Sequence, residues 1–337
     1  MFSTYSNIRP TTRLPLDLIR RIVDYTASTG DAKTIHSLVL VSRQFKEWVD
    51  EKLYAKVELH FESQIASFAN TIENPIMHTS DFFTQSIHSL SVSFDHGSGH
   101  VPRILLACRS VESFTMYIVR TSFHKTTPLI DQNISHLEYS LHHLRPRRVQ
   151  TQLYHCFRDP LSRFSHSLFE YTTHLAILDD WEYWTRWSDD FSRLPALTHL
   201  SLDLRVGANG LSQGDGWRIS DCVWRILNTC KGLDVCIIRL LFDSSPDLTR
   251  NMVLRMMHEK GMSDARLVFL RETTIFGDSM ARSFKDGSLW SFGEKVVSEQ
   301  LRKSSLQLDS IRRCDLPRHL ASRAMGKAIS WNGRANF

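Results

Sequence analysis

The sequence predicts an α/β protein in two parts: a helical module over residues 14–60, and a larger region over residues 61–300 in which strands alternate with helices. Three observations lead to this prediction. Apolar residues recur at helical spacing between residues 14 and 57. Beyond residue 60 they alternate over short runs, as in strands with one buried face. The length of 337 residues exceeds the roughly 250–300 at which one hydrophobic core stops growing.

The helical module is predicted to contain three helices and a short strand. The first helix begins at Pro15, because the missing N–H of proline needs no partner in the first helical turn. Its apolar stripe consists of Leu18, Ile19, Ile22 and Val23. Either Asp31 or Thr34 is placed to cap the second helix, and Ser42 is placed to cap the third. A strand is expected to follow at residues 57–59.

Two motifs of this module stand out in combination. The first motif is Leu14-Pro15, followed by Leu18-Ile19 and Ile22. The second is the run Leu38–Arg43, followed by Trp48 and by the run Leu53–Val57. Together they resemble the F-box, a helical module of ubiquitin-ligase substrate adaptors. The resemblance implies that a Skp-type adaptor, and through it a cullin, binds Leu14, Pro15, Leu18, Ile19, Leu40, Val41 and Trp48. Taken without the resemblance, an amphipathic segment of this length is more often plain core than a docking module.

The larger region is predicted to be an irregular repeat. In one recurring pattern, an apolar residue is followed by further apolar residues three, five and seven positions later. The pattern begins at Ile87, Val111, Ile134, Leu197 and Leu233, and a looser copy lies at 175–177. The second apolar residues fall at 90, 114, 137, 175, 200 and 236, so the steps by subtraction are 24, 23, 38, 25 and 36. Leucine-rich repeats have periods of about 20–29 residues. The two long steps predict insertions at residues 142–170 and 205–230.

Two units share a longer prefix that ends in cysteine. Residues 104–111 parallel residues 226–233, and Cys108 and Cys230 hold equivalent positions. The prefix looks like the cysteine-containing leucine-rich repeat, and the segments 194–202, 263–268 and 287–294 are typical of F-box proteins abundant in mushroom-forming fungi. The resemblance implies a solenoid of parallel strands with both thiols buried as small hydrophobes. An ordinary α/β domain with a parallel sheet also fits the alternation of strands and helices.

Two segments are candidates for holding a target protein. A basic cluster contains Arg145, Arg147 and Arg148, and an acidic stretch further on contains Trp181, Trp184 and Trp187. Aromatic residues are enriched at binding hot spots, so these segments predict a target contact along a basic-then-acidic edge. The alternative is that the arginines lie on a solvated loop and the tryptophans, spaced by three, pack against the repeat. Aromatic side chains more often pack than bind, which favours this alternative.

The remaining features indicate no chemistry in this chain. We find no catalytic constellation and no metal-ligand spacing among the six cysteines and sixteen histidines, and we expect no cofactor. The carboxylate pair Asp179-Asp180 is surrounded by polar residues, so we do not expect the raised pKa that acid–base catalysis requires. The net charge of +5 is small for this length and does not by itself argue for nucleic acid, so we expect no nucleic-acid partner. No run approaches the about 18 apolar residues of a membrane span.

The ends of the chain are predicted to lie outside the two folded parts. Residues 1–13 form an N-terminal arm without the apolar segment of a secretory signal, so we expect the cytoplasm or the nucleus. Residues 301–337 are basic and poor in apolar residues, which predicts a disordered tail. The F-box resemblance implies that the chain is a substrate adaptor of an SCF-type cullin ubiquitin ligase. The alternative is a ligase-independent interaction scaffold whose helical module caps the repeat.

Overall fold

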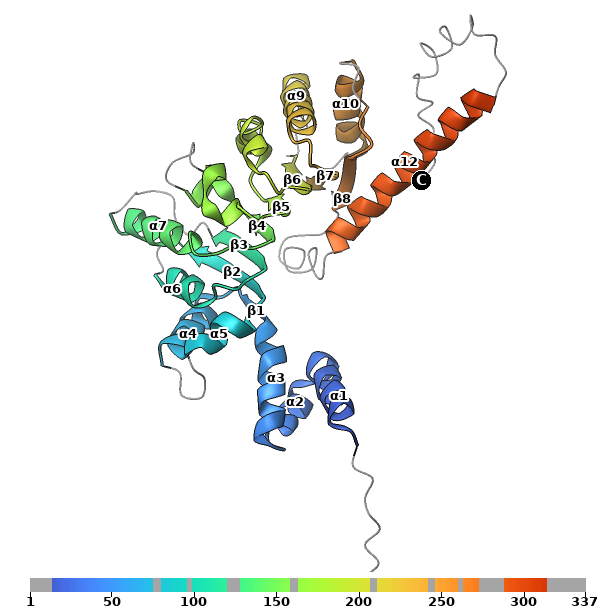
Figure 1. Cartoon of the computed structure of the whole chain (residues 1–337). Helices are drawn as coiled ribbons and strands as arrows, with labels where there is room; N and C mark the ends of the chain where they lie inside the picture. Colours follow the sequence, from blue (N-terminus) through green and yellow to red (C-terminus); the bar gives the residue numbers. More distant parts are fainter. Residues whose placement is uncertain are drawn as a thin grey trace, which may run out of the picture.

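The structure is an α/β fold built on one eight-stranded, all-parallel sheet. The computed structural model describes residues 14–74, 80–95, 99–119, 128–157, 163–206, 211–241, 246–259, 263–272 and 288–313. The strands lie in the sheet in their chain order, and together they form an arc (Figure 1). They are β1 (Lys56–Leu59), β2 (Ser89–Asp95), β3 (Ser113–Val119), β4 (Arg148–Thr151), β5 (His174–Ile177), β6 (His199–Arg205), β7 (Val235–Leu241) and β8 (Leu267–Glu272).

One row of apolar residues runs across all eight strands in register. It consists of Val57, Leu90, Phe114, Val149, Leu175, Leu200, Cys236 and Leu267. The steps between them by subtraction are 33, 24, 35, 26, 25, 36 and 31 residues. Because side chains alternate along a strand, these residues all face the same side of the sheet. The prediction of parallel strands side by side near residues 90, 114, 200 and 236 is confirmed.

The strand predicted around Leu137 is wrong. Residues 134–141 belong to helix α7 (Pro128–Leu141), and the strand of this unit is β4, about a dozen residues further on. Leu137 and Leu141 are buried and lie four residues apart, a spacing that fits a helix as well as the expected pattern. The segment 142–170 is therefore not a pure insertion, because it contains β4. The segment 205–230 contains helix α9 (Gln213–Thr229).

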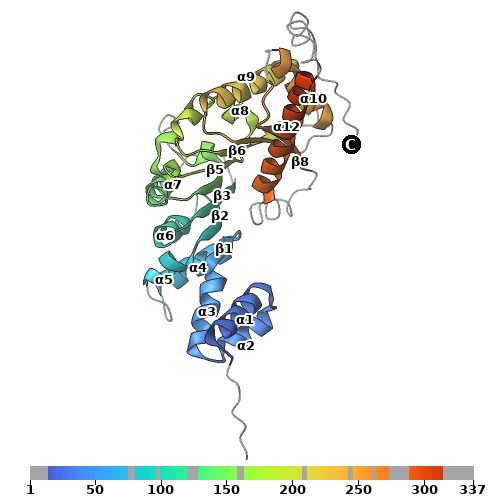
Figure 2. The same cartoon turned by 45° about the vertical axis from the view of Figure 1, so that its right-hand side comes forward.

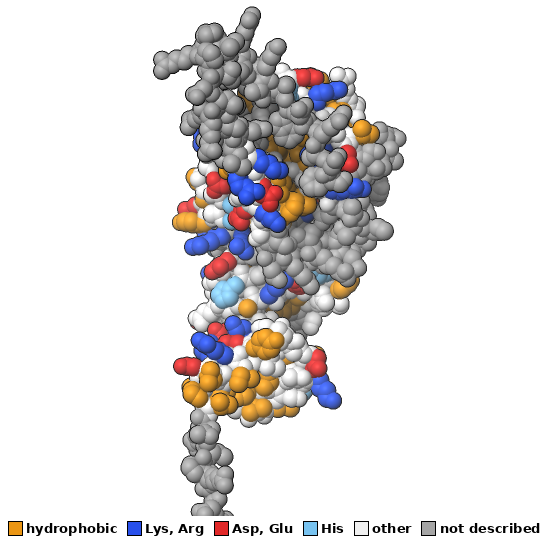
Figure 3. Space-filling view, turned by 90° about the vertical axis from the view of Figure 1, so that its right-hand side faces the viewer, with side chains coloured by type: hydrophobic (Ala, Val, Ile, Leu, Met, Phe, Trp, Pro, Cys, Tyr) orange, Lys and Arg blue, Asp and Glu red, His pale blue; other side chains and the backbone are white. Residues whose placement is uncertain are grey.

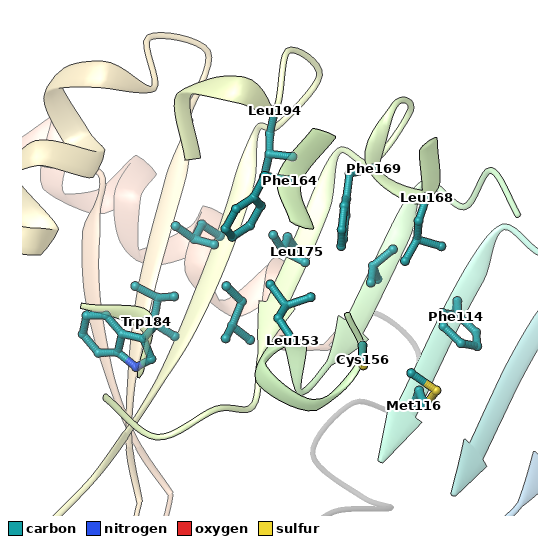
Figure 4. Packing of buried hydrophobic residues seen from close by; sticks show 14 of the residues in the cluster. Phe114, Met116, Leu153, Cys156, Phe164, Leu168, Phe169, Leu175, Trp184 and Leu194 are labelled. Carbon is teal, nitrogen blue, oxygen red and sulfur yellow. The ribbon is translucent and has the colours of Figure 1, made fainter. Parts of the chain in front are cut away.

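Most helices cover the outer, convex side of the arc, where the main core lies (Figure 1). These helices are α4 (Glu62–Glu73), α5 (Ser80–Ser86), α6 (His100–Ala107), α7, α8 (Trp181–Trp184), α9 and α10 (Pro246–Glu259). Short 3-10 turns at Leu153–His155, Arg163–Ser165, Ser167–Phe169 and Asp190–Arg193 replace long helices beside β4 and β5. Figure 4 shows Phe164, Phe169, Leu175 and Leu194 packed in this layer.

The two cysteines of the shared prefix hold equivalent positions. Cys108 follows α6 and its N–H donates to the carbonyl of Ile104 at 3.1 Å; Cys230 follows α9 and its N–H donates to the carbonyl of Ile226 at 2.9 Å. Both thiols are buried. Burial raises the pKa of Cys108 to about 12 and also raises the pKa of Cys230. The prediction that both act as small buried hydrophobes is confirmed.

The N-terminal module consists of α1 (Leu16–Thr29), α2 (Ala32–Val39) and α3 (Arg43–Ala55), which leads directly into β1. The predicted caps are present. The Thr34 N–H donates to Oδ1 of Asp31 at 2.7 Å, and the Phe45 N–H donates to Oγ of Ser42 at 3.1 Å. Pro15 lies one residue before the helix. The module has a small core of its own, formed by Val23, Ala27, Trp48 and Val49.

The last helix, α12 (Ser288–Arg313), lies on the opposite, concave side of the sheet over β7 and β8 (Figure 2). Leu289, Trp290 and Val297 pack there against the sheet residues Ala176, Val235, Ile237 and Val268. Because α12 continues to Arg313, the prediction of a disordered tail from residue 301 is wrong for residues 301–313. The N-terminal arm and residues 314–337 lie outside the described residues.

Candidate functional site

The N-terminal module carries an exposed apolar face. Leu40 is 73% exposed, Tyr25 is 71% exposed and Leu14 is 57% exposed. The face consists of Leu14, Leu16, Leu18, Ile22, Tyr25, Leu40, Val41 and Leu53. Figure 3 shows hydrophobic side chains gathered over this module. Large contiguous apolar patches are uncommon on soluble monomers, and many of them are interaction sites.

The helix α1 has two apolar stripes, and only one of them is used inside the chain. Ile19, Val23 and Ala27, spaced by four, belong to the small core against α3. Leu18, Ile22 and Tyr25, spaced by four and then three residues, form a second stripe along the neighbouring side of the helix and remain exposed. A surface helix needs one apolar stripe to pack on its own protein. The second stripe is therefore available to another molecule.

Leu40 and Val41 lie in the tight turn between α2 and α3. The Val41 N–H donates to the carbonyl of Leu38 at 3.1 Å, and the Ser42 cap fixes the start of α3 directly afterwards. The most exposed apolar residue of the module thus lies on hydrogen-bonded backbone. A side chain presented in this way loses little backbone freedom on binding, which favours affinity.

The seven residues that the F-box resemblance implies as adaptor contacts differ in their exposure to solvent. Leu14, Pro15, Leu18, Leu40 and Val41 are exposed, Ile19 is half-buried and Trp48 is buried. Trp48 as a direct contact is therefore wrong. Its ring stacks on Phe45 with centroids 5.7 Å apart, and the Arg20 guanidinium lies 5.7 Å above it. The sequence reasoning missed Leu16, the first residue of α1, and Tyr25, although the position of Tyr25 on the same side of the helix as Leu18 and Ile22 could have revealed it.

The tryptophan-rich stretch packs into the protein, as the alternative reading predicts. Trp181, Trp184 and Trp187 are all buried, so a recognition patch made of these residues is wrong. The Trp184 Nε1–H donates to the carbonyl of Asp203 at 2.7 Å. The guanidinium of Arg163 lies 4.1 Å from the ring of Trp187 and is itself buried. Arg163 therefore does not add to the exposed basic cluster of Arg145, Arg147 and Arg148.

Asp179 lies in a buried environment that the sequence did not reveal. Burial raises its pKa to about 7, even though its carboxylate accepts the N–H of Leu153 at 2.6 Å and of Tyr154 at 3.0 Å. The assignment of this carboxylate to polar surroundings is wrong. Both oxygens hold the 3-10 turn that follows β4, which is a structural task. Its buried neighbour Cys156 has a pKa raised to about 12 by burial and is no ready nucleophile.

The basic cluster is split by the start of β4. Nε of Arg145 lies 3.3 Å from Oε2 of Glu170, and its Nη1 donates to the carbonyl of His142 at 2.6 Å. Arg147 and Arg148 are both exposed, but Arg148 is the first residue of β4. Arg148 lines a cavity of about 220 Å³ on the concave face. The structure therefore separates the three arginines, and Arg148 alone among them faces the concave surface.

A stack of aromatic rings forms the boundary of this cavity. The rings of His174 and His199 are parallel, with centroids 4.2 Å apart, and Trp290 of α12 meets His174 edge-on at 5.2 Å. Oε1 of Glu294 lies 3.2 Å from Nε2 of His199. Burial lowers the pKa of His174 to about 4, and burial also lowers the pKa of His199. Both rings are therefore neutral at neutral pH.

Within the described ranges, no group of three or more His, Cys, Asp and Glu side chains is placed to hold a metal ion. In the same part of the chain, no helix has the length and apolar character needed to cross a membrane. Comparison with known proteins finds no family model that matches the chain, and no curated protein matches it either.

Proposed function

We propose that this chain is a substrate-recognition subunit of an SCF-type cullin ubiquitin ligase, acting in the cytoplasm or the nucleus. The observation that carries the proposal is the exposed apolar face of the N-terminal module. It contains four of the seven residues that the F-box resemblance implies as contacts of a Skp-type adaptor, and a fifth, Pro15, is also exposed. The chain performs no chemistry in this proposal. It raises the concentration of a target protein near the ligase.

The larger region supports the target-binding half of the proposal. We interpret it as a leucine-rich-repeat-like solenoid, because its strands follow one another in chain order, and as an irregular one, because four of its seven steps exceed the about 20–29 residues of regular repeats. The equivalent positions of Cys108 and Cys230 favour the same interpretation. Repeat proteins use extended concave surfaces to bind other proteins.

A second candidate function is a ligase-independent interaction scaffold. One observation favours it: α3 continues into β1 and also packs on α5, so the module closes the end of the sheet as a cap would. However, the cap of a repeat protein has a polar outer surface. The outer surface of this module is apolar, which favours the docking function.

The test is co-expression of the chain with a Skp-type adaptor. We expect the chain alone to be poorly soluble, because its apolar face is uncovered, and the adaptor to rescue it and co-purify. The variant with both Leu40→Asp and Val41→Asp should lose the adaptor, and Leu14→Ala with Pro15→Ala should weaken the complex. The matched control is Leu248→Asp on α10, since Leu248 is 71% exposed but lies far from the module in the sequence.

The outcomes separate the two candidate functions. Loss of the adaptor in the Leu40/Val41 variant, with the Leu248 variant unaffected and both folded by circular dichroism, supports docking through the face. A wild-type chain that remains soluble and binds no Skp-type adaptor contradicts the ligase proposal and leaves the scaffold.

A further inference from the structure

The concave face of the sheet is divided into two halves of different character. Over β5 to β8, the apolar residues Ala176, Val235, Ile237 and Val268 are covered by α12. Over β1 to β4, the face consists mostly of polar and charged side chains, whose neighbours in the strands belong to the main core on the other side. By this alternation they are Lys56, Glu58, Ser89, Ser91, Ser93, Asp95, Ser113, Thr115, Tyr117, Arg148 and Gln150. The helix α12 thus covers the apolar half, and the polar half carries the charged side chains.

The cavity of about 220 Å³ lies where the two halves meet. A registered row of side chains crosses it from strand to strand: Lys56, Ser89, Ser113, Arg148 and His174. Neighbouring members of such a row are about 4.8 Å apart along the sheet. Leu289 and Trp290 of α12 form the apolar wall at one end. The volume suits one or two side chains of a protein partner, since small-molecule pockets are usually about 300–1,000 Å³.

The lining of the cavity is suited to negative charge. It contains two cations and several hydrogen-bond donors, and no aspartate or glutamate is among its lining residues. Nζ of Lys56 is held 3.0 Å from Oε1 of Glu58. The guanidinium of Arg148 is exposed, and no aspartate or glutamate of the described chain forms an ion pair with it. A guanidinium presents a fork of donors that matches a carboxylate in two parallel hydrogen bonds.

We propose that the polar half of the concave face binds an acidic segment of the target protein, with an aspartate or glutamate carboxylate on Arg148 and the next apolar side chain against Trp290. This inference rests on the proposed target-binding function and names the chemistry of the target. The hydroxyls of Ser89, Ser113 and Thr115 donate to the remaining carboxylate oxygens. The argument for an acidic occupant is charge complementarity at a cavity whose lining contains no acid.

The experiment uses the full chain co-purified with a Skp-type adaptor, applied to an array of synthetic twelve-residue peptides. The peptides carry, in separate sets, glutamate and aspartate, phosphoserine, or lysine and arginine, each interspersed with leucine. We expect binding to concentrate on the glutamate and aspartate set and to weaken as salt screens the charges. Arg148→Glu should reduce the affinity about tenfold or more, because it replaces an attraction by a repulsion at a partly desolvated contact.

The matched control is Arg147→Glu. Arg147 is the adjacent residue, is also exposed and carries the same charge, but it does not line the cavity. A loss confined to Arg148→Glu supports the proposal. Equal losses in both variants would assign recognition to the exposed basic cluster and overturn the proposal. Binding only to phosphoserine peptides, only to basic peptides, or to no set would also overturn it. The adaptor remains bound in all of these samples, so failure here is distinct from failure of the proposed function.

Discussion

Gly293 controls how closely α12 approaches the sheet, and enlarging it is the sharpest perturbation of the concave face. A Cβ added at this glycine would lie 2.8 Å from Cγ1 of Val235 and 2.8 Å from Cδ1 of Ile237. Ordinary carbon contacts are about 3.5–4.0 Å, so both side chains or the helix must move. Val235 is β-branched and has few alternative rotamers. A leucine at position 293 would therefore push α12 away from β7.

The magnitude follows from two opposing effects. Overpacking a close contact costs about 1–3 kcal/mol. Replacing glycine by leucine inside a helix returns about 0.8 kcal/mol through helix propensity. We therefore expect Gly293→Leu to weaken the docking of α12 by about 1–2 kcal/mol. Such a change corresponds to roughly a 5- to 30-fold shift of the docking equilibrium.

Hydrogen exchange measures this equilibrium directly. Amides of α12 in Gly293→Leu should exchange about 5- to 30-fold faster than in the wild type, while amides of β2 and β3 keep their protection, because local opening exposes only the docked element. The control is Ser291→Leu, which adds the same side chain at an exposed position of the same helix. Unchanged protection of α12 in Gly293→Leu, or equal loss in both variants, would refute the close approach inferred for Gly293.

Three further predictions concern buried polar groups. Because the pKa of His174 is lowered to about 4 and that of His199 is also lowered, the unfolded chain binds more protons below pH 6.5, so the free energy of unfolding should fall between about pH 6.5 and 4. Because His174 is only partly buried, solvent screens part of this effect. We therefore expect a loss of only about 1 kcal/mol in denaturant titrations, reduced in a His174→Gln variant. Asp203→Ala leaves the buried Arg239 without the carboxylate that its Nε contacts at 2.7 Å. The variant should therefore lower the free energy of unfolding by about 3–5 kcal/mol. A loss below about 1 kcal/mol, as for an ion pair on the surface, would contradict the burial of this pair. Cys108, with its pKa raised to about 12, should react with a thiol reagent only on unfolding, and rapid labelling of the native chain would show that its burial is wrong.

The sequence predicts the local features of this fold well. Asp31 and Ser42 cap helices as expected, because a cap depends on residues only three positions apart. The strands with strict alternation, such as β2, β3 and β6, are found where the pattern places them. The segment around Leu137 failed because Leu137 and Leu141 fit a helical spacing equally well. There, local periodicity could not decide between strand and helix.

The remaining features depend on contacts between distant segments. Asp179 looks polar in the sequence, yet it is buried because the turn at Leu153, 26 residues earlier, folds onto it. The sequence does not indicate that α12 docks on the sheet, because the helix contacts the sheet through only a few apolar side chains and through the close approach at Gly293. Arg148 looks like one of three equivalent arginines until the start of β4 places it at the cavity. The sequence named residues of the candidate sites, but only the fold separates those that are buried from those that are exposed.

The most direct test of the central claim is a calorimetric titration of the chain with a purified Skp-type adaptor. The account predicts saturable one-to-one binding with a dissociation constant of about 1 μM or tighter, and a negative heat-capacity change from the burial of apolar surface. The variant with Leu40→Asp and Val41→Asp should bind at least about 100-fold more weakly, since two apolar side chains contribute about 3 kcal/mol or more on burial. Absence of binding by the wild-type chain, or equal binding by the variant, would contradict the claim that this apolar face is the docking surface.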